Sequence, residues 1–379
     1  MSAGQIDDLG KSILIRPSNL EGRLKLPPSK SHAMRWLILA SMDSSPTEIK
    51  MNEIGRDVQA MIDCLSDMGL KYQEGIMFGG EFKFKTDTLD CKNSGTALRF
   101  LIGQVASCGQ EITFDGDASL RVRTSLPLIE SLKISSSTFG DYHLPMKIRG
   151  PVTSQNIKID TSISSQFLSS ILLMTPRTNG FELVTTGKSV SQKHSDLTWD
   201  LCKLTGAVKI GQPWTVRCPD VEIPPDPSMT AFCRLAGLDI ENPPKSEDLI
   251  GHDLSNLNLK DSNDLITPLA AILALSDGGT ITGAHHATFK ESNRIKCTKK
   301  MLEQFSIHCN ETADGLQIPG GQTPISPNQL VKTYGDHRIQ MTAVILASKC
   351  GATIEGENLH EIAWPSFIQQ LQNCGLIID

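Results

Sequence analysis

The chain has 379 residues, of which 36 are Lys or Arg and 42 are Asp or Glu, so its formal net charge at pH 7 is −6. This length allows about two domains with their own cores. The acidic balance argues against a general nucleic-acid-binding protein, which would carry a basic patch and a high pI.

From the sequence as given, we expect neither a secretory signal nor a membrane span. The first fifteen residues contain Asp7 and Asp8 where a secretory signal would be cationic, and no apolar run approaches the roughly 18 residues of a membrane span. We therefore expect a soluble cytoplasmic protein. The ten cysteines form no C-x-x-C pair, which favours buried, reduced thiols over a zinc site or a disulfide framework.

Polar capping residues precede amphipathic helical patterns at six places along the chain. The expected helix starts lie near Ser31, Ser94, Ser164, Ser228, Asn263 and Asp336. Five of the six segments contain a second helical pattern followed by a short apolar run. The fourth segment has Pro243 and Pro244 and no comparable helix. The pattern predicts repeated units, three in each of two domains, with the fourth unit truncated.

Short β-rich stretches separate these helices, for example ITFDGD at 112–117 and FELVTTG at 181–187. The expected fold class is therefore α/β or α+β. Prolines concentrate at 26–28 and 224–227, where the chain could cross between domains. We predict one domain of residues 28–224 and a discontinuous domain of residues 1–27 and 225–379, with the active site in the cleft between them.

The first motif, SKSHAMR at 29–35, combines a helix start with two cations. Ser29 or Ser31 can cap the helix. Lys30 lies at its N-terminal end, and Arg35 follows about one turn later. Free backbone N–H groups and the helix dipole favour an anion there. A phosphate-binding site and a capped surface helix with solvated cations both fit this motif.

Two further motifs place small polar residues at helix starts. NSGTALR at 93–99 ends in a cation, and SISSQFLSS at 162–170 offers Ser164, Ser165 and Gln166 as neutral donors. By itself the second of these also fits a plain helix cap.

The second half of the chain contains candidate proton-handling groups. In KESNR at 290–294, helical spacing would place Lys290 and Arg294 on one face beside Glu291, and such a cluster could transfer protons. A solvated helix face is the alternative. Asp264 is either a carboxylate in the first turn of a helix or a base for a substrate hydroxyl. Arg338, after a capping Asp336, suggests an anionic ligand.

Five segments together resemble the signature set of the 5-enolpyruvylshikimate-3-phosphate (EPSP) synthase family. They are PPSKSHAMR, NSGTALRFL, SSQFL, KESNR and YGDHR, in this order and spacing over nearly the whole chain. The resemblance implies two domains of three βαβαββ-type units each. It also implies transfer of the enolpyruvyl group of phosphoenolpyruvate to the 5-hydroxyl of shikimate 3-phosphate through a tetrahedral intermediate, with release of phosphate. This family needs no cofactor and no metal.

The resemblance also implies roles for individual residues. The positions that would bind shikimate 3-phosphate are Lys30, Ser31, Arg35, Ser164, Ser165, Gln166, Ser191, Asp264, His286 and Lys290. Those around phosphoenolpyruvate are Lys30, Gly95, Arg123, Gln166, Arg294 and Arg338. Asp264 or Lys290 would take the proton of the acceptor hydroxyl, and Glu291 or Lys30 would protonate C3. The expected partners are these two small molecules, without nucleic acid or membrane, and we expect a monomer.

Three positions depart from the family pattern. Ile362 stands where the family usually has a Lys two residues before an aromatic-Pro pair, and His194 replaces an aromatic hydroxyl near the acceptor. Phe100 also replaces a common small or aliphatic residue. The alternatives are therefore a related enolpyruvyl transferase with another hydroxyl acceptor, or a catalytically weakened anion-binding homologue.

Overall fold

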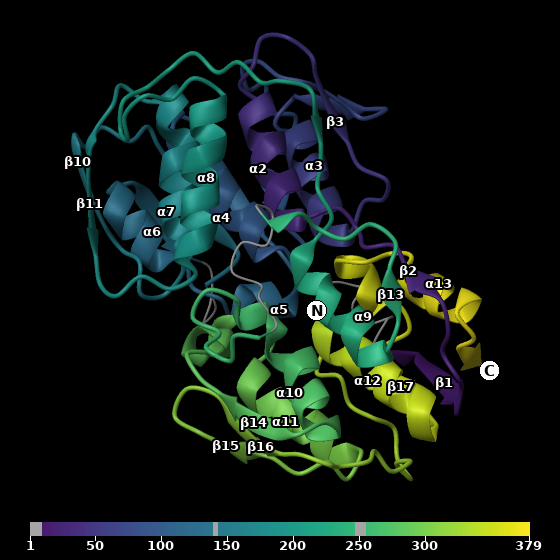
Figure 1. Ribbon diagram of the computed structural model, residues 1–379. Coiled ribbons are helices and arrows are strands. Elements are labelled where there is room, and N and C mark those ends of the chain that lie inside the picture. Colours follow the sequence, from purple (N-terminus) through teal and green to yellow (C-terminus); the bar gives the residue numbers. More distant parts are fainter. Residues whose placement is uncertain (1–9, 139–142, 247–254) are drawn as a thin grey trace. The chain divides into compact units, whose positions relative to one another are not determined.

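The structure is a computed structural model that describes residues 10–138, 143–246 and 255–379 (Figure 1). The chain divides into two compact units, one of Met1–Pro27 with Pro225–Asp379 and one of Pro28–Pro224. Each unit has its own hydrophobic core, because the two clusters of buried residues have no member in common. We refer to them as the continuous unit (28–224) and the discontinuous unit (1–27 and 225–379).

Three inner helices of the continuous unit contact one another pairwise: α2 (Lys30–Ala40), α4 (Gly95–Ala106) and α7 (Ser165–Met174). Their sequences are apolar on most sides, and almost every residue is buried. The outer helices are α3 (Arg56–Asp67), α6 (Leu126–Leu132) and α8 (Gln192–Leu204), and two short helices are α5 (Ala118–Arg121) and η1 (Thr175–Arg177). Helix α8 is amphipathic, since its buried residues fall on one face.

The sheets of the continuous unit repeat one strand order. The first is β12 (Val221–Glu222), β3 (Thr47–Lys50), β5 (Ile76–Phe78) and β4 (Lys71–Gln73), and the second is β6 (Thr88–Asp90), β7 (Glu111–Asp115), β9 (Met146–Arg149) and β8 (Ser135–Thr138). In both, a parallel pair is followed by two antiparallel pairings. The third sheet is the parallel pair β10 (Asn156–Asp160) and β11 (Glu182–Thr186).

Helices of the discontinuous unit follow the same plan (Figure 1). Its inner helices α9 (Thr230–Ala236), α10 (Ile266–Leu275) and α12 (His337–Cys350) contact one another pairwise. The other helices are α11 (Arg294–Gln304), α13 (Phe367–Asn373) and short 3-10 turns, η2 (Pro227–Met229), η4 (Asn263–Leu265), η5 (His285–Phe289) and η6 (Leu359–Ile362).

Its strands also repeat the order seen in the other unit. One sheet is β14 (Gly278–Ile281), β16 (Leu316–Pro319) and β15 (Asn310–Glu311), and Asn258 bridges in parallel to the end of β14. Another is β17 (Ala352–Glu355), β1 (Ser12–Arg16) and β18 (Ile377–Ile378), to which Val331 adds a parallel bridge. The last is the parallel pair β2 (Arg23–Leu24) and β13 (Asp239–Ile240).

Two details concern the third and fourth units. The short apolar run that follows the second helical pattern of the third segment, at 208–210, lies in an irregular segment and not in a strand, and Val208 is 88% exposed. The third sheet is therefore two-stranded in the described residues, which the sequence did not indicate. The predicted loss of a helix in the fourth unit falls partly on residues 247–254, outside the described residues.

All ten cysteines are free thiols, and most are buried. In the ranges that the structure covers, no helix combines the length and apolarity that a bilayer crossing requires.

Candidate active site

The inner helices of the continuous unit run parallel and bring their N-terminal turns together. Arg99 in α4 hydrogen-bonds the amide oxygen of Gln166 in α7, and the Gln166 amide donates back to Thr96 Oγ1 at 2.9 Å. Arg35, in the second turn of α2, donates to Ser169 Oγ in the second turn of α7 at 3.3 Å. Contacts between equivalent turns place the helix starts at one end, so their free N–H groups and dipoles add.

Helix α2 begins at Lys30, after Ser29 as the N-cap, which fits one of the two capping residues that the sequence allowed. The ammonium of Lys30 lies 2.7 Å from Asp57 Oδ2, and only 6% of the Asp57 side chain is exposed. Asp57 belongs to the first turn of α3, where the helix dipole favours a carboxylate. Sequence reasoning missed Asp57, because its partner is 27 positions away and no local pattern links the two.

Arg35 is buried, and its hydrogen bonds go to neutral oxygens. Nε donates to Thr198 Oγ1 at 2.7 Å, and the Nη atoms donate to the backbone carbonyls of Ser31 and His194 and to Ser169 Oγ. Burial lowers the pKa of the Arg35 guanidinium to about 9, which leaves it charged at neutral pH. Among the residues described, no carboxylate lies within ion-pair distance of it, so the cation can accept an anionic ligand as its counter-charge.

Gly95 opens α4 beside two guanidinium groups. A Cβ at this position would lie 3.4 Å from Arg123 Nη1 and 3.7 Å from Arg99 Nη1, so any side chain would occupy the space in front of both cations. Arg123 is held by Ser119 Oγ at 2.6 Å and by the carbonyl of Asn93 at 3.4 Å. Arg123 follows the short helix α5.

The predicted serines lie at helix starts of the same unit. Ser164 caps α7 by accepting from the Gln166 backbone N–H at 3.2 Å, and Ser165 is buried in the first turn. Ser191 is the N-cap of α8 in the left-handed conformation, with φ of 49°. For a non-glycine residue this conformation carries strain, which is common at ligand-binding positions. Ser31 is half-buried in the first turn of α2.

In the discontinuous unit, Arg294 is surrounded by three carboxylates. Its Nη1 lies 2.5 Å from Asp264 Oδ1, its Nη2 2.5 Å from Glu291 Oε2, and its Nε 2.8 Å from Asp336 Oδ2. Only 1% of the Arg294 side chain is exposed. Burial opposes the charged form, but the three carboxylates outweigh it and raise the pKa of Arg294. Arg294 thus organises the carboxylates, a role that its placement around phosphoenolpyruvate did not include.

The KESNR motif does not lie on one helix face, as its spacing suggested. Lys290 follows η5, and α11 begins only at Arg294, because the Asn293 side chain caps the helix by accepting from Lys296 N at 3.2 Å. Lys290 and Glu291 therefore lie in the connection before the helix. The backbone turn, rather than i,i+4 spacing, places Glu291 against Arg294.

The carboxylate of Asp264 lies within ion-pair distance of three cations of this unit. Besides Arg294, it has Lys290 Nζ at 3.5 Å from Oδ1 and Arg338 Nη2 at 3.8 Å from Oδ2. Arg338 also donates to Ser228 Oγ at 2.9 Å. The starts of α9, α10 and α12 therefore come together as those of the other unit do. The partners Asp336 and Ser228 had been recognised from sequence only as helix starts.

His286 is buried next to this cluster. Burial, and then the charge of Lys290, lower the pKa of the His286 imidazole from 6.5 to about 4. The imidazole is therefore neutral at physiological pH and can act as a hydrogen-bonding group without adding a charge.

A stability prediction follows from this imidazole. The unfolded chain binds a proton at His286 below about pH 6.5, whereas the folded chain does so only near pH 4, so acidification favours unfolding. We expect a His286→Asn variant to gain up to about 3 kcal/mol relative to the parent as the pH falls from about 7 to about 4. Urea unfolding at several pH values measures this difference, and a pH-independent difference would contradict the assignment.

The position that lacks the expected lysine is apolar and buried: Ile362 ends the turn η6 with 4% exposed. In the described parts of the chain, no group of three or more His, Cys, Asp or Glu is arranged to hold a metal ion. The three carboxylates of the discontinuous unit instead enclose a guanidinium.

Comparison with known proteins gives a consistent result over the whole chain. The family model described as EPSP synthase (3-phosphoshikimate 1-carboxyvinyltransferase) matches residues 15–238 and 204–371. The chain belongs to the EPSP synthase family. The predicted family membership is thereby confirmed.

Individual relatives cover nearly all of this chain. A protein named 3-phosphoshikimate 1-carboxyvinyltransferase from Methanothermobacter thermautotrophicus is 29% identical, over 95% of this chain and 97% of its own. One of the same name from Clostridium kluyveri is 28% identical, over 97% and 98%. The solved structure of EPSP synthase from Acinetobacter baumannii has a TM-score of 0.75 at 20% identity and covers 97% of this chain and 98% of that one. This likeness confirms the predicted two-domain α/β fold class.

Proposed function

We propose that this protein is a 3-phosphoshikimate 1-carboxyvinyltransferase, which transfers the enolpyruvyl group of phosphoenolpyruvate to the 5-hydroxyl of shikimate 3-phosphate and releases phosphate. The observation that carries the proposal is the family match along both units. The two clusters of helix starts supply what such a reaction needs: cations for two anionic substrates, and groups that take up and deliver protons. One chain supplies both clusters, so we propose that the monomer is active.

The cations of the continuous unit are proposed to bind the substrates. Arg35, with the hydroxyl groups of Ser31, Ser164, Ser165 and Ser191, would bind shikimate 3-phosphate. Arg123 and the backbone at Gly95 would bind phosphoenolpyruvate together with Lys30, and Gln166 would contact both substrates. Each charge-assisted hydrogen bond is worth roughly 1.5–3 kcal/mol, so a few contacts are enough for micromolar affinity.

The discontinuous unit is proposed to handle the acceptor hydroxyl. Asp264 is an acceptor whose carboxylate is fixed by Arg294 and lies near Lys290. It would remove the hydroxyl proton, while Lys290 and His286 orient the acceptor. Arg338 would complete the binding of phosphoenolpyruvate.

Addition requires a proton at C3 of phosphoenolpyruvate, and we assign its delivery to Lys30. Glu291 Oε2 is engaged by Arg294 at 2.5 Å, whereas Lys30 carries ammonium protons and is partly exposed beside Asp57. The order of events is attack of the acceptor oxygen on C2 with protonation of C3, then loss of the C3 proton with expulsion of phosphate from the tetrahedral intermediate. Holding both substrates in reacting geometry can supply as much as ~7–11 kcal/mol.

The test is a direct assay with purified protein. Phosphate release should require both phosphoenolpyruvate and shikimate 3-phosphate, and the organic product should contain the enol ether at the 5-position. Replacing shikimate 3-phosphate by UDP-N-acetylglucosamine should give no phosphate. Phosphate release with that acceptor alone would favour a related enolpyruvyl transferase. Binding of both substrates without turnover would favour the weakened anion-binding homologue.

A further inference from the structure

Arginine–phenylalanine stacking links neighbouring inner helices of the continuous unit. The guanidinium carbon of Arg35 in α2 lies 5.2 Å from the ring centroid of Phe100 in α4. That of Arg99 in α4 lies 5.3 Å from the ring centroid of Phe167 in α7. Both rings are fully buried. Each ring therefore supports a cation of the preceding inner helix from inside the core.

In the stacked pair of Arg35 and Phe100, the positive charge of Arg35 is hydrogen-bonded only to neutral groups among the described residues. A guanidinium has five N–H hydrogens, and those of Arg35 meet Thr198, Ser31, Ser169 and His194, which leaves one on Nη1 for another acceptor. Where the structure describes the chain, none of these partners is anionic. The electron-rich face of the Phe100 ring therefore attracts the Arg35 guanidinium, and this attraction persists in the buried environment.

The stacked pair of Arg99 and Phe167 influences the site through the side-chain amide of Gln166, which Arg99 hydrogen-bonds. Arg99 Nη1 donates to the Gln166 side-chain oxygen, and the Gln166 nitrogen donates to Thr96 Oγ1 at 2.9 Å. These two bonds fix which end of the amide faces each neighbour. One N–H of Gln166 remains for a ligand.

We propose that Phe100 and Phe167 are positioning residues: their rings fix the guanidinium groups of Arg35 and Arg99, and thereby the donors that Arg35 and Gln166 present to the anionic acceptor. The proposal depends on the proposed function, since it takes shikimate 3-phosphate as that acceptor. It also gives a physical reason for Phe100, whose aromatic ring departs from the common residue at this position.

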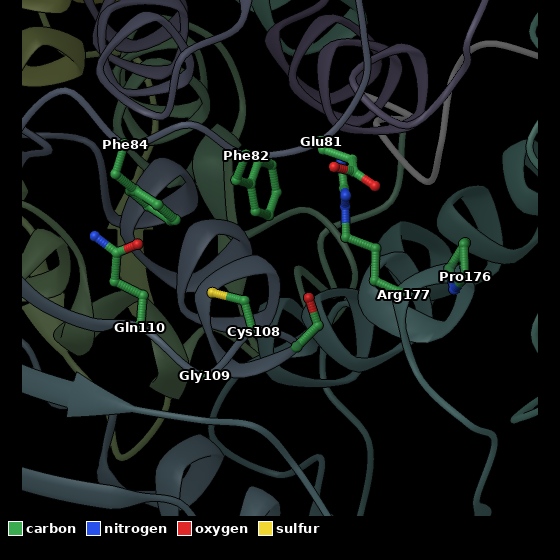
Figure 2. A pocket seen from close by; sticks show the side chains of 9 residues that line it. Glu81, Phe82, Phe84, Cys108, Gly109, Gln110, Pro176 and Arg177 are labelled. Atoms are coloured by element: carbon green, nitrogen blue, oxygen red, sulfur yellow. The ribbon is translucent and has the colours of Figure 1, made fainter.

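A third stacked pair in the same unit serves as a comparison. Arg177 lies 3.9 Å from the Phe82 ring centroid, on the wall of a hollow of about 540 Å³ past the C-terminal ends of α4 and α7 (Figure 2). Arg177 donates to the carbonyls of Ser41 and Gly80 at 3.2 and 2.9 Å, so it ties the end of α2 to the loop after β5. This pair has the same chemistry but lies at the opposite ends of the helices.

The experiment measures binding of shikimate 3-phosphate by calorimetry, together with kcat and KM, for Phe100→Leu and Phe167→Leu. A lost cation–π contact at a desolvated site should raise the dissociation constant of shikimate 3-phosphate about 3- to 30-fold, with kcat changed less than KM. Phe100→Tyr keeps the ring and should restore binding to within about threefold of the parent. In an Arg35→Gln background, Phe100→Leu should cause no further loss, because the cation it supports is gone.

Two control variants separate positioning from general loss of packing. Phe114→Leu removes a ring that is equally buried and that stacks on no arginine among the described residues, and Phe82→Leu removes the stack at the far end. Both should bind shikimate 3-phosphate within about twofold of the parent. If Phe100→Leu folds poorly, Phe100→Met is measured instead. Methionine fills the space of the ring better than leucine does, and it also lacks a ring.

The proposal would be overturned by Phe100 variants that bind as the parent does, or by Phe114→Leu weakening binding as much as Phe100→Leu. Failure of the proposed function looks different: the parent protein itself would then neither bind shikimate 3-phosphate nor release phosphate.

Discussion

Replacing Arg294 by methionine is expected to lower the free energy of unfolding by about 3–5 kcal/mol and to abolish activity. The guanidinium is the shared partner of Asp264, Glu291 and Asp336, and the side chain of Asp336 is fully buried. Without it, three carboxylates would remain close together, and those of Glu291 and Asp336, at 8% and 0% exposed, have little access to water. Urea denaturation followed by circular dichroism measures the loss.

Two comparisons make this result specific. Arg294→Lys keeps the charge but cannot contact three carboxylates from one planar group, so it should recover less than half of the lost stability. Lys299→Met breaks an exposed pair with Glu303 and should cost less than about 1 kcal/mol. A destabilisation of Arg294→Met no larger than that of Lys299→Met would show that the cluster does not depend on Arg294.

Replacing Lys30 by methionine should lower kcat for phosphate release about 10²–10⁴-fold, the usual contribution of a positioned proton donor. Methionine preserves the length of the side chain but removes both the charge and the transferable proton. Stopped-flow measurement of phosphate release at saturating substrates separates this effect from weaker binding. The isotope content at C3 after reaction in heavy water reports whether protonation itself has slowed.

Asp57→Asn and Lys203→Met are the matched controls for Lys30. Asp57→Asn keeps the ammonium but loosens its position, so kcat should fall by about tenfold, less than for Lys30→Met. Lys203 pairs with Asp200 on the exposed surface of α8, and its loss should leave kcat unchanged. A Lys30→Met enzyme with kcat within tenfold of the parent would exclude Lys30 as the proton donor and leave Glu291 as the candidate.

Helix starts were predictable from the sequence because capping is local. Ser94, Ser164 and Asp336 each accept a hydrogen bond from a backbone N–H two or three residues ahead, and short-range spacing is sufficient to recognise that arrangement. The cations that follow these caps were recognised for the same reason. Their placement within each unit then follows from the packing of the inner helices.

The partners of these cations could not be predicted in the same way. Asp57 meets Lys30 across 27 positions and Asp336 meets Arg294 across 42, and only folding brings such residues together. KESNR was misread because its i,i+4 spacing fits a helix, although Asn293 caps α11 inside the motif. The structure of the apolar run at 208–210 could not be predicted for a related reason, since short apolar runs do not reveal whether a neighbouring strand is available.

The N-terminal strand β1 lies in the middle of its sheet, between β17 and β18. Residues 12–16 leave the ribosome long before their partners, residues 352–355 and 377–378, are synthesised. The continuous unit has no such requirement, because residues 28–224 are made as one stretch and can fold during translation. The discontinuous unit must wait until residues 352–378 have been synthesised, and until then the edges of β1 are exposed to chaperones and to mispairing.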